Sequence, residues 1–161
     1  MKRIAVSLSL LCASSAVLAV EAACEPIVAA TEKTSAQPAR HTTVELGDGQ
    51  RGESVLADGQ VHIRMGERWM KAPASVLEAE RKLNADLRKG TIKTWDCKRV
   101  GTETVDAVST TVYSYRQEIP GLPKVDGPIR IYIGRDGLVY ALESGGTRSR
   151  IRYTGVAAPK L

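Results

Sequence analysis

Short runs in which apolar and polar residues alternate, separated by glycine-containing turns, make up most of this chain beyond its N-terminal quarter. Residues 129–133 are typical, with three isoleucines that alternate with an arginine and a tyrosine. Side chains of a strand point alternately to its two faces, so this period of two predicts strands with one buried face. The dipeptides Asp58-Gly59 and Asp136-Gly137 favour tight hairpin turns. Because hairpins join strands that run in opposite directions, the pattern predicts an antiparallel sheet.

We expect about eight or nine strands from this pattern. They cover residues 41–46, 54–57, 61–65, 68–71, 94–100, the later part of 104–117, 129–133, 138–144 and 149–156. The segment 119–128 is expected to be a loop, because its prolines cannot donate hydrogen bonds to a central strand.

Two segments carry the signs of helices. Residues 25–36 have a proline in the first turn, where proline is tolerated. A longer helix is expected to begin at Ala74 or Ser75, with apolar residues at three- and four-residue steps up to Leu87, and to end at Gly90. Its apolar stripe is narrow and has no aromatic residue, which favours packing on the protein core over binding to a membrane.

The predicted fold class is α+β: a curved antiparallel β-sheet, half-barrel-like, packed on one long α-helix, plus a short N-terminal helix. The long helix is expected to cover one side of the sheet, which either curls around it or nearly closes. Residues 23–161 are expected to form a single β-rich domain of ordinary size.

The N-terminus resembles an export signal. Lys2 and Arg3 precede an uncharged, largely apolar stretch, and small residues at Val20 and Ala22 suit cleavage after residue 22. The stretch is shorter than the roughly 20 residues of a membrane-spanning helix and is broken by serines, so we expect a cleavable signal peptide over residues 1–22. The alternative is a lipoprotein acylated on Cys24, which the carboxylate of Glu21 three positions earlier disfavours. The expected location is therefore periplasmic or secreted.

Cysteine usage agrees with export. Cys12 lies inside the signal, so the mature chain keeps Cys24 and Cys97, and an even number in an exported domain predicts a disulfide between them. The bridge closes a loop of about 70 residues, for which chain entropy predicts about 4 kcal/mol of stabilisation. The alternatives are two free buried thiols or a metal site, but His41 and His62 lack the spacing of metal ligands.

The rest of the chain carries little catalytic chemistry. The two histidines lie in strand-like polar contexts and are expected at the surface. Five aspartates lie beside or near glycines, as turns require: Asp48, Asp58, Asp106, Asp126 and Asp136. No glycine loop that could cradle phosphate follows a strand and opens a helix. We therefore expect no enzyme, no catalytic residue, no metal and no cofactor. The net charge of +5 is mild, and nucleic acid is not an expected partner of an exported protein.

One set of residues suggests a binding site. Arg148, Arg150 and Arg152 share a face of the last expected strand, and Arg130 could lie on the same side. Together they could hold the phosphate or carboxylate head groups of a lipid or glycan, with peripheral membrane contact. The alternative is a solvated strand face whose charges prevent edge-to-edge association.

Several segments resemble the domains of the outer-membrane lipoprotein carrier-like family. The resemblance lies in the strand pair at residues 60–64 and 67–71, the turn and strand at 100–107 and 111–115, the hairpin at 131–138 and the final segment 153–159. It spans roughly residues 42–159. It implies a strongly curved antiparallel sheet wrapped around helices, with an apolar concavity that holds acyl chains.

Two functions follow as expectations. The first is a periplasmic binding or accessory protein for an apolar or amphipathic envelope molecule, a lipid or a lipoprotein. The second is a structural or inhibitor-type protein that acts on an envelope protein through an interface, without a small ligand. An apolar pocket of several hundred cubic ångströms favours the first, and a concavity filled by side chains favours the second.

Overall fold

The computed structural model describes residues 20–161, so residues 1–19 of the expected signal peptide lie outside the described residues. Two α-helices, a short 3₁₀ turn and nine strands follow one another along these described residues. Their bounds are η1 Ala22–Cys24, α1 Glu25–Ser35, β1 Arg40–Glu45, β2 Arg51–Ala57, β3 Gln60–Met65, β4 Arg68–Lys71, α2 Ser75–Arg88, β5 Lys93–Val105, β6 Val108–Glu118, β7 Ile129–Gly134, β8 Val139–Ser144 and β9 Thr147–Arg152.

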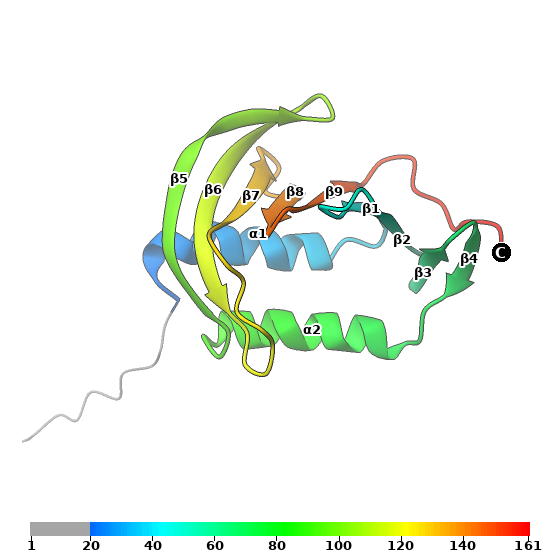
Figure 1. The fold of residues 1–161 in the computed structure, drawn as a ribbon, viewed down its shortest axis with the longest axis horizontal. Coiled ribbons are helices and arrows are strands. Elements are labelled where there is room, and N and C mark those ends of the chain that lie inside the picture. Colours follow the sequence, from blue (N-terminus) through cyan, green and yellow to red (C-terminus); the bar gives the residue numbers. More distant parts are fainter. Residues whose placement is uncertain (1–19) are drawn as a thin grey trace, which may run out of the picture.

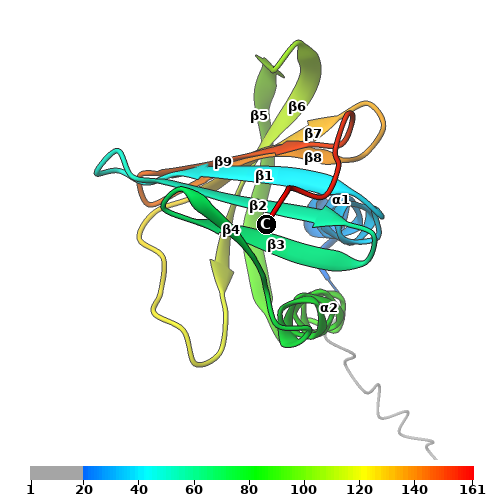
Figure 2. The same cartoon turned by 90° about the vertical axis from the view of Figure 1, so that its right-hand side faces the viewer.

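All nine strands form one open antiparallel sheet in the order β4-β3-β2-β1-β9-β8-β7-β6-β5. The strands β1–β4 and β5–β9 are two meanders, and the pairing of β1 with β9 joins them, with Thr42 opposite Ile151. Figure 2 shows β9, β1, β2 and β3 side by side in that order. In Figure 1 the sheet is an arch, with α1 and then α2 on its concave side. The curved antiparallel sheet expected from the sequence is confirmed, and it remains open at both edges.

Helix α1 covers the concave side of the sheet, which we call the inner face. Its Ile27 and Ala30 pack in one cluster with inward-pointing residues of β6, β7 and β8, among them Ile131, which is 1% exposed. Thr34, at the end of the helix, accepts a hydrogen bond from the backbone N–H of Val139 at 2.9 Å. The short helix therefore forms the main contact between the helical layer and the sheet.

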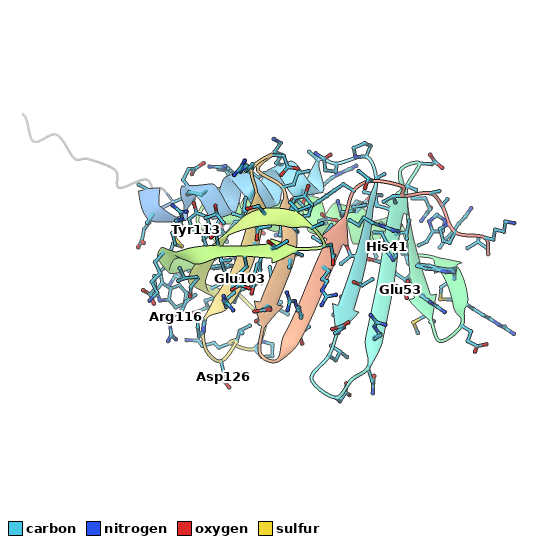
Figure 3. The ribbon with its side chains drawn as sticks, turned by 90° about the horizontal axis from the view of Figure 1, so that it is seen from above. His41, Glu53, Glu103, Tyr113, Arg116 and Asp126 are labelled. Carbon is cyan, nitrogen blue, oxygen red and sulfur yellow. A yellow bond between two sulfur atoms is a disulfide. The ribbon has the colours of Figure 1, made fainter. Side chains whose placement is uncertain are left out.

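The opposite side of the sheet, the outer face, is covered in part by the β5–β6 hairpin. Figure 3, seen from above, shows this hairpin lying across β7, β8 and β9. Val105, near its tip, packs with Val112, Tyr132 and Ala141 in a second small core. As a result Tyr132 is fully buried although its neighbour Ile131 points to the inner face. Both faces of β7 are thus covered, one by a helix and one by the chain's own hairpin.

Helix α2 makes much less contact with the sheet than its apolar stripe predicts. Its first turns reach the sheet through Leu77, which packs against Leu56 and Val61. Its last turn is held by Leu87, which packs with Val28 of α1. Between these ends, Leu83 is 44% exposed. The sequence predicted that the long helix, α2, would cover one side of the sheet. The short helix α1 covers it instead, and a space separates the middle of α2 from the sheet.

The end of α2 and the membrane-spanning potential of both helices can be compared with the sequence-based predictions. Gly90 has φ +75°, the left-handed conformation that ends a helix, as the sequence predicted. Neither helix among residues 20–161 is long and apolar enough to cross a membrane.

The expected disulfide between Cys24 and Cys97 is present. Cys24 immediately precedes α1 and is fully buried, whereas Cys97 lies on β5 and packs against the inner core. The bond therefore fixes the start of α1 to the edge strand of the sheet.

Candidate functional site

A cavity of about 360 Å³ lies between α2, the end of α1 and the inner face of the sheet, and we call it the groove. Most of the surface that lines it is apolar, although polar side chains also contribute. The lining consists of Thr31, Thr34, Ser35, Arg40, Thr42, Glu80, Leu83, Asn84, Leu87, Ile92, Gln117, Ile119, Ile131, Val139, Leu142, Ser149 and Ile151.

The groove exists because the strands present inward side chains that α2 does not meet. Thr42 of β1 lies opposite Ile151 of β9, and Leu142 of β8 lies opposite Ser149, two residues before Ile151. All of these side chains point inward and line the groove. Thr42 and Ser149 are small, so they leave space beneath the helix. From the other side Leu83 reaches toward this space and remains partly exposed. The result is an apolar surface that the protein itself does not cover.

A second, more open cavity of about 830 Å³ lies next to the groove. It is bounded by the β2–β3 turn, the segment after α1 and residues 156–158 near the C-terminus. Ser35, Glu80 and Asn84 line both cavities, so the two spaces share a boundary on α2. The groove and the larger, solvent-facing depression are therefore neighbours.

Arg40 and Glu80 are the charged residues among the described residues that line the groove. The Arg40 guanidinium donates a hydrogen bond to the Glu80 carboxylate across the gap between β1 and α2. The Arg40 side chain is 12% exposed and that of Glu80 is 31% exposed. Arg40 also donates to the backbone carbonyl of Thr34 at 3.4 Å. This pair places one positive and one negative charge, both partly buried, in a site whose surface is otherwise largely apolar.

The four arginines singled out from the sequence all lie on the outer face, away from the groove. Arg130 pairs with Glu103 of the overlying hairpin and with Glu143, and Arg148 pairs with the same Glu143 at 3.3 Å. Both guanidinium carbons stand over the ring of Tyr132, at 5.4 and 5.7 Å from its centroid. Two of the expected anion-binding groups are thus brought together around a carboxylate.

Arg150 and Arg152 have a different environment. Neither has a carboxylate partner among residues 20–161, and Arg152 contacts Nδ1 of His41 at 3.1 Å. Arg150 lies opposite Thr43 on β1 and Ala141 on β8. Two of the four arginines, Arg130 and Arg148, therefore pair with carboxylates, whereas Arg150 and Arg152 have none among the described residues.

The two histidines differ from one another. His41 is partly exposed and its Nε2 lies 3.2 Å from Glu53, which also accepts a hydrogen bond from Arg64 at 3.0 Å (Figure 3 labels His41 and Glu53). His62 was expected at the surface but is 5% exposed, and its Nδ1 has no hydrogen-bond partner among the described residues. It lies between Val55 and Lys71 of the neighbouring strands β2 and β4. The prediction of a surface position was wrong for His62, because a polar strand pattern does not report such neighbours.

The tyrosines provide no reactive group at ordinary pH. Burial, together with the neighbouring Glu143 carboxylate, raises the pKa of Tyr132 to about 12. Burial raises the pKa of Tyr153 to about 12 as well. Both hydroxyls are therefore neutral hydrogen-bond donors, and the Tyr153 hydroxyl donates to the backbone carbonyl of Val139.

The groove-lining residues were not identified from the sequence as a site. Arg40 and Glu80 lie forty positions apart and meet only because α2 crosses beneath β1. The available signal was the unusual composition of the inner face, where Thr42 and Ser149 stand at positions that a filled core would give to larger apolar residues.

Comparison with known proteins identifies relatives in fold. No protein-family model matches the chain, and no curated protein matches it by sequence. Among solved structures, the Mycobacterium tuberculosis lipoprotein LppX is similar with a TM-score of 0.50 and 17% identity, over 87% of this chain and 97% of LppX. LprF from Mycobacterium bovis has a TM-score of 0.46 and 13% identity, over 86% of this chain and 94% of LprF. MucB in complex with MucA has a TM-score of 0.49 and 15% identity, over 84% of this chain and 57% of MucB.

The likeness to LppX concerns the fold. It confirms, at the level of the fold, the expected resemblance of this chain, with its open antiparallel sheet, to a protein described as a lipoprotein. The identity of 17% is too low to transfer a ligand or a residue's role.

Proposed function

We propose that this protein binds an apolar or amphipathic molecule of the cell envelope, such as a lipid or the acyl chain of a lipoprotein, in the groove. The observation that carries the proposal is the groove itself. It has a volume of about 360 Å³, within the usual range of ligand sites, and an apolar lining that α2 spans without filling. Covering such a surface with an acyl chain is favourable by about 25 cal/mol per Å² of apolar area removed from water.

The proposed location is the periplasm or the exterior of the cell. The disulfide supports it, because disulfides persist in oxidising compartments. The same bond favours a soluble exported protein over a lipoprotein. The sulfur of Cys24 is bonded to Cys97 and cannot at the same time carry a lipid through a thioether.

Native mass spectrometry of the protein purified from its own periplasm tests the proposal, with a co-purifying lipid as the expected result. A blocking variant shows where the lipid sits. Thr42→Trp fills the groove, whereas Thr43→Trp, one residue along β1, places the same ring on the outer face. We expect lipid to be absent from the first variant and retained by the second. Equal retention by both would place the ligand elsewhere.

The alternative function, an interface with an envelope protein and no small ligand, is also tested by this experiment. Lipid-free protein that still captures an envelope protein, with no difference between the two variants, would favour it. The partly exposed Leu83 and the open groove instead support a ligand of small cross-section.

We further propose that Arg150 and Arg152 contact anionic head groups when the protein approaches a membrane. Neither of these two guanidinium groups has a carboxylate partner among residues 20–161, whereas Arg130 and Arg148 both pair with Glu143. Replacing Arg150 and Arg152 with serine is expected to reduce co-sedimentation with vesicles that contain anionic lipid. Serine at Arg130 and Arg148 should leave sedimentation unchanged, and equal losses from both double variants would contradict the proposal.

A further inference from the structure

We infer that the molecule bound in the groove is a single-chain amphiphile with an anionic head group, typically a carboxylate, and that Arg40 binds this head group in place of Glu80. The inference rests on the proposed function and adds to it the chemical class of the ligand.

Arg40 has the position that a head-group ligand requires. It is the first residue of β1, points to the inner face and lines the groove, and its side chain is largely buried. A guanidinium group has five N–H donors in a planar fork. Among the described residues, it donates to Glu80 and to the Thr34 carbonyl. Unused donors of a partly buried guanidinium are available to a second acceptor.

Glu80 is a poor permanent partner for this charge. It is carried by α2, which contacts the rest of the protein chiefly near its two ends, and its side chain is more exposed than that of Arg40. Removing charges from water is costly, and a single partner offsets the cost only in part. Glu80 also borders the larger open cavity, where its carboxylate can return to water. It can therefore leave Arg40 when another anion arrives.

The geometry of the two cavities sets the orientation of the ligand. Glu80 lines both cavities, and its partner Arg40 lines the groove beside it. Apolar residues such as Leu142 and Ile119 provide most of the remaining lining surface. A tail on the apolar lining places its head group at Arg40. A carboxylate can accept two parallel hydrogen bonds from a guanidinium, which an alcohol or ester cannot reproduce. The groove therefore selects an anionic head as well as an apolar tail.

The test compares two probes with the same tail. Myristate is anionic and monomyristoylglycerol is neutral, and both are titrated calorimetrically into the full mature chain with its disulfide intact. We expect Arg40→Met to weaken myristate binding about tenfold or more and to change monomyristoylglycerol binding less than about twofold, because a charge-assisted hydrogen bond is lost for one probe only. Glu80→Gln removes the competing carboxylate and is expected to tighten myristate binding severalfold.

Arg40→Lys keeps the charge without the fork, and we expect intermediate myristate affinity from it, which provides a second variant if Arg40→Met does not fold. If wild type binds both probes and the Arg40 variants weaken them equally or not at all, the inference is overturned and the proposed function stands. Selective binding of the neutral probe has the same consequence. If wild type binds neither probe, the proposed function fails together with the inference.

Discussion

Removing the disulfide tests how the N-terminal helix is held on the sheet. The partners are 73 positions apart, and for a loop of this length the chain-entropy relation predicts about 4 kcal/mol of stabilisation. Ordinary domains are stable by about 5–15 kcal/mol, so the loss is a large part of the total. Replacing Cys24 and Cys97 with alanine avoids a buried hydroxyl at Cys24, which is fully buried.

Urea unfolding followed by circular dichroism measures the effect. We expect the double alanine variant to lose about 4 kcal/mol of unfolding free energy and to show a larger m-value, because its unfolded state is no longer restricted. Wild type treated with reductant should match the variant, which serves as the control for the substitutions themselves. A loss below about 1 kcal/mol in both samples would refute the view that this bond anchors α1 to β5.

Three further changes follow from the packing and the charges. Ile131→Ala, in the inner core, should lower the unfolding free energy by about 3 kcal/mol, and a loss near zero in urea titration would mean that the inner face is not packed as described. Ala107→Gly should raise stability by about 1 kcal/mol, because Ala107 has φ +68° at the hairpin tip and glycine adopts this conformation without strain; unchanged stability would contradict this. The hydrogen bond from Arg88 lowers the pKa of Glu32. This ion pair therefore stabilises the folded state at pH values above the ordinary pKa near 4.5, and the stabilisation is lost as the pH falls through the lowered pKa. Arg88→Gln should therefore cost under about 1 kcal/mol at pH 7 and progressively less in acid, and a difference that is constant with pH would exclude this linkage.

The local structure of this chain was largely predictable from sequence, because it depends on periodicity and turn chemistry. Residues 129–133 alternate strictly and form β7, and Asp58-Gly59 forms the expected hairpin turn, with both residues at positive φ. Proline in the first turn and Gly90 at the end marked helices that the structure places within a residue or two of the expected bounds.

The long-range arrangement could not be predicted in the same way. The pairing of β1 with β9 brings Thr42 beside Ile151, and no local signal reports such a contact. The burial of Tyr132 depends on a hairpin that folds over the outer face, which is a property of sheet curvature. The apolar stripe of α2 predicted a buried helix face. Burial requires a partner surface within contact distance, and Leu83, which remains partly exposed, does not reach the sheet.

The candidate site shows the same division. The arginines of β9 share a face, as alternation requires, but the sequence did not indicate that Glu143 would stand between Arg130 and Arg148. The groove depends on Arg40 and Glu80, which belong to a strand and a helix that meet only in the folded chain. A candidate site that arises where two elements fail to pack against each other is harder to predict from sequence than one marked by a motif.

The central claim is that the groove binds an acyl chain, and methyl NMR tests it most directly. In protein labelled at its leucine, isoleucine and valine methyl groups, we expect titration with myristate to shift the signals of Leu83, Leu142 and Ile151, which line the groove. The signals of Val105 and Val112, buried in the outer core, should remain unchanged and serve as the control. Shifts confined to other surfaces, or no shift at concentrations that saturate comparable lipid-binding proteins, would contradict the account.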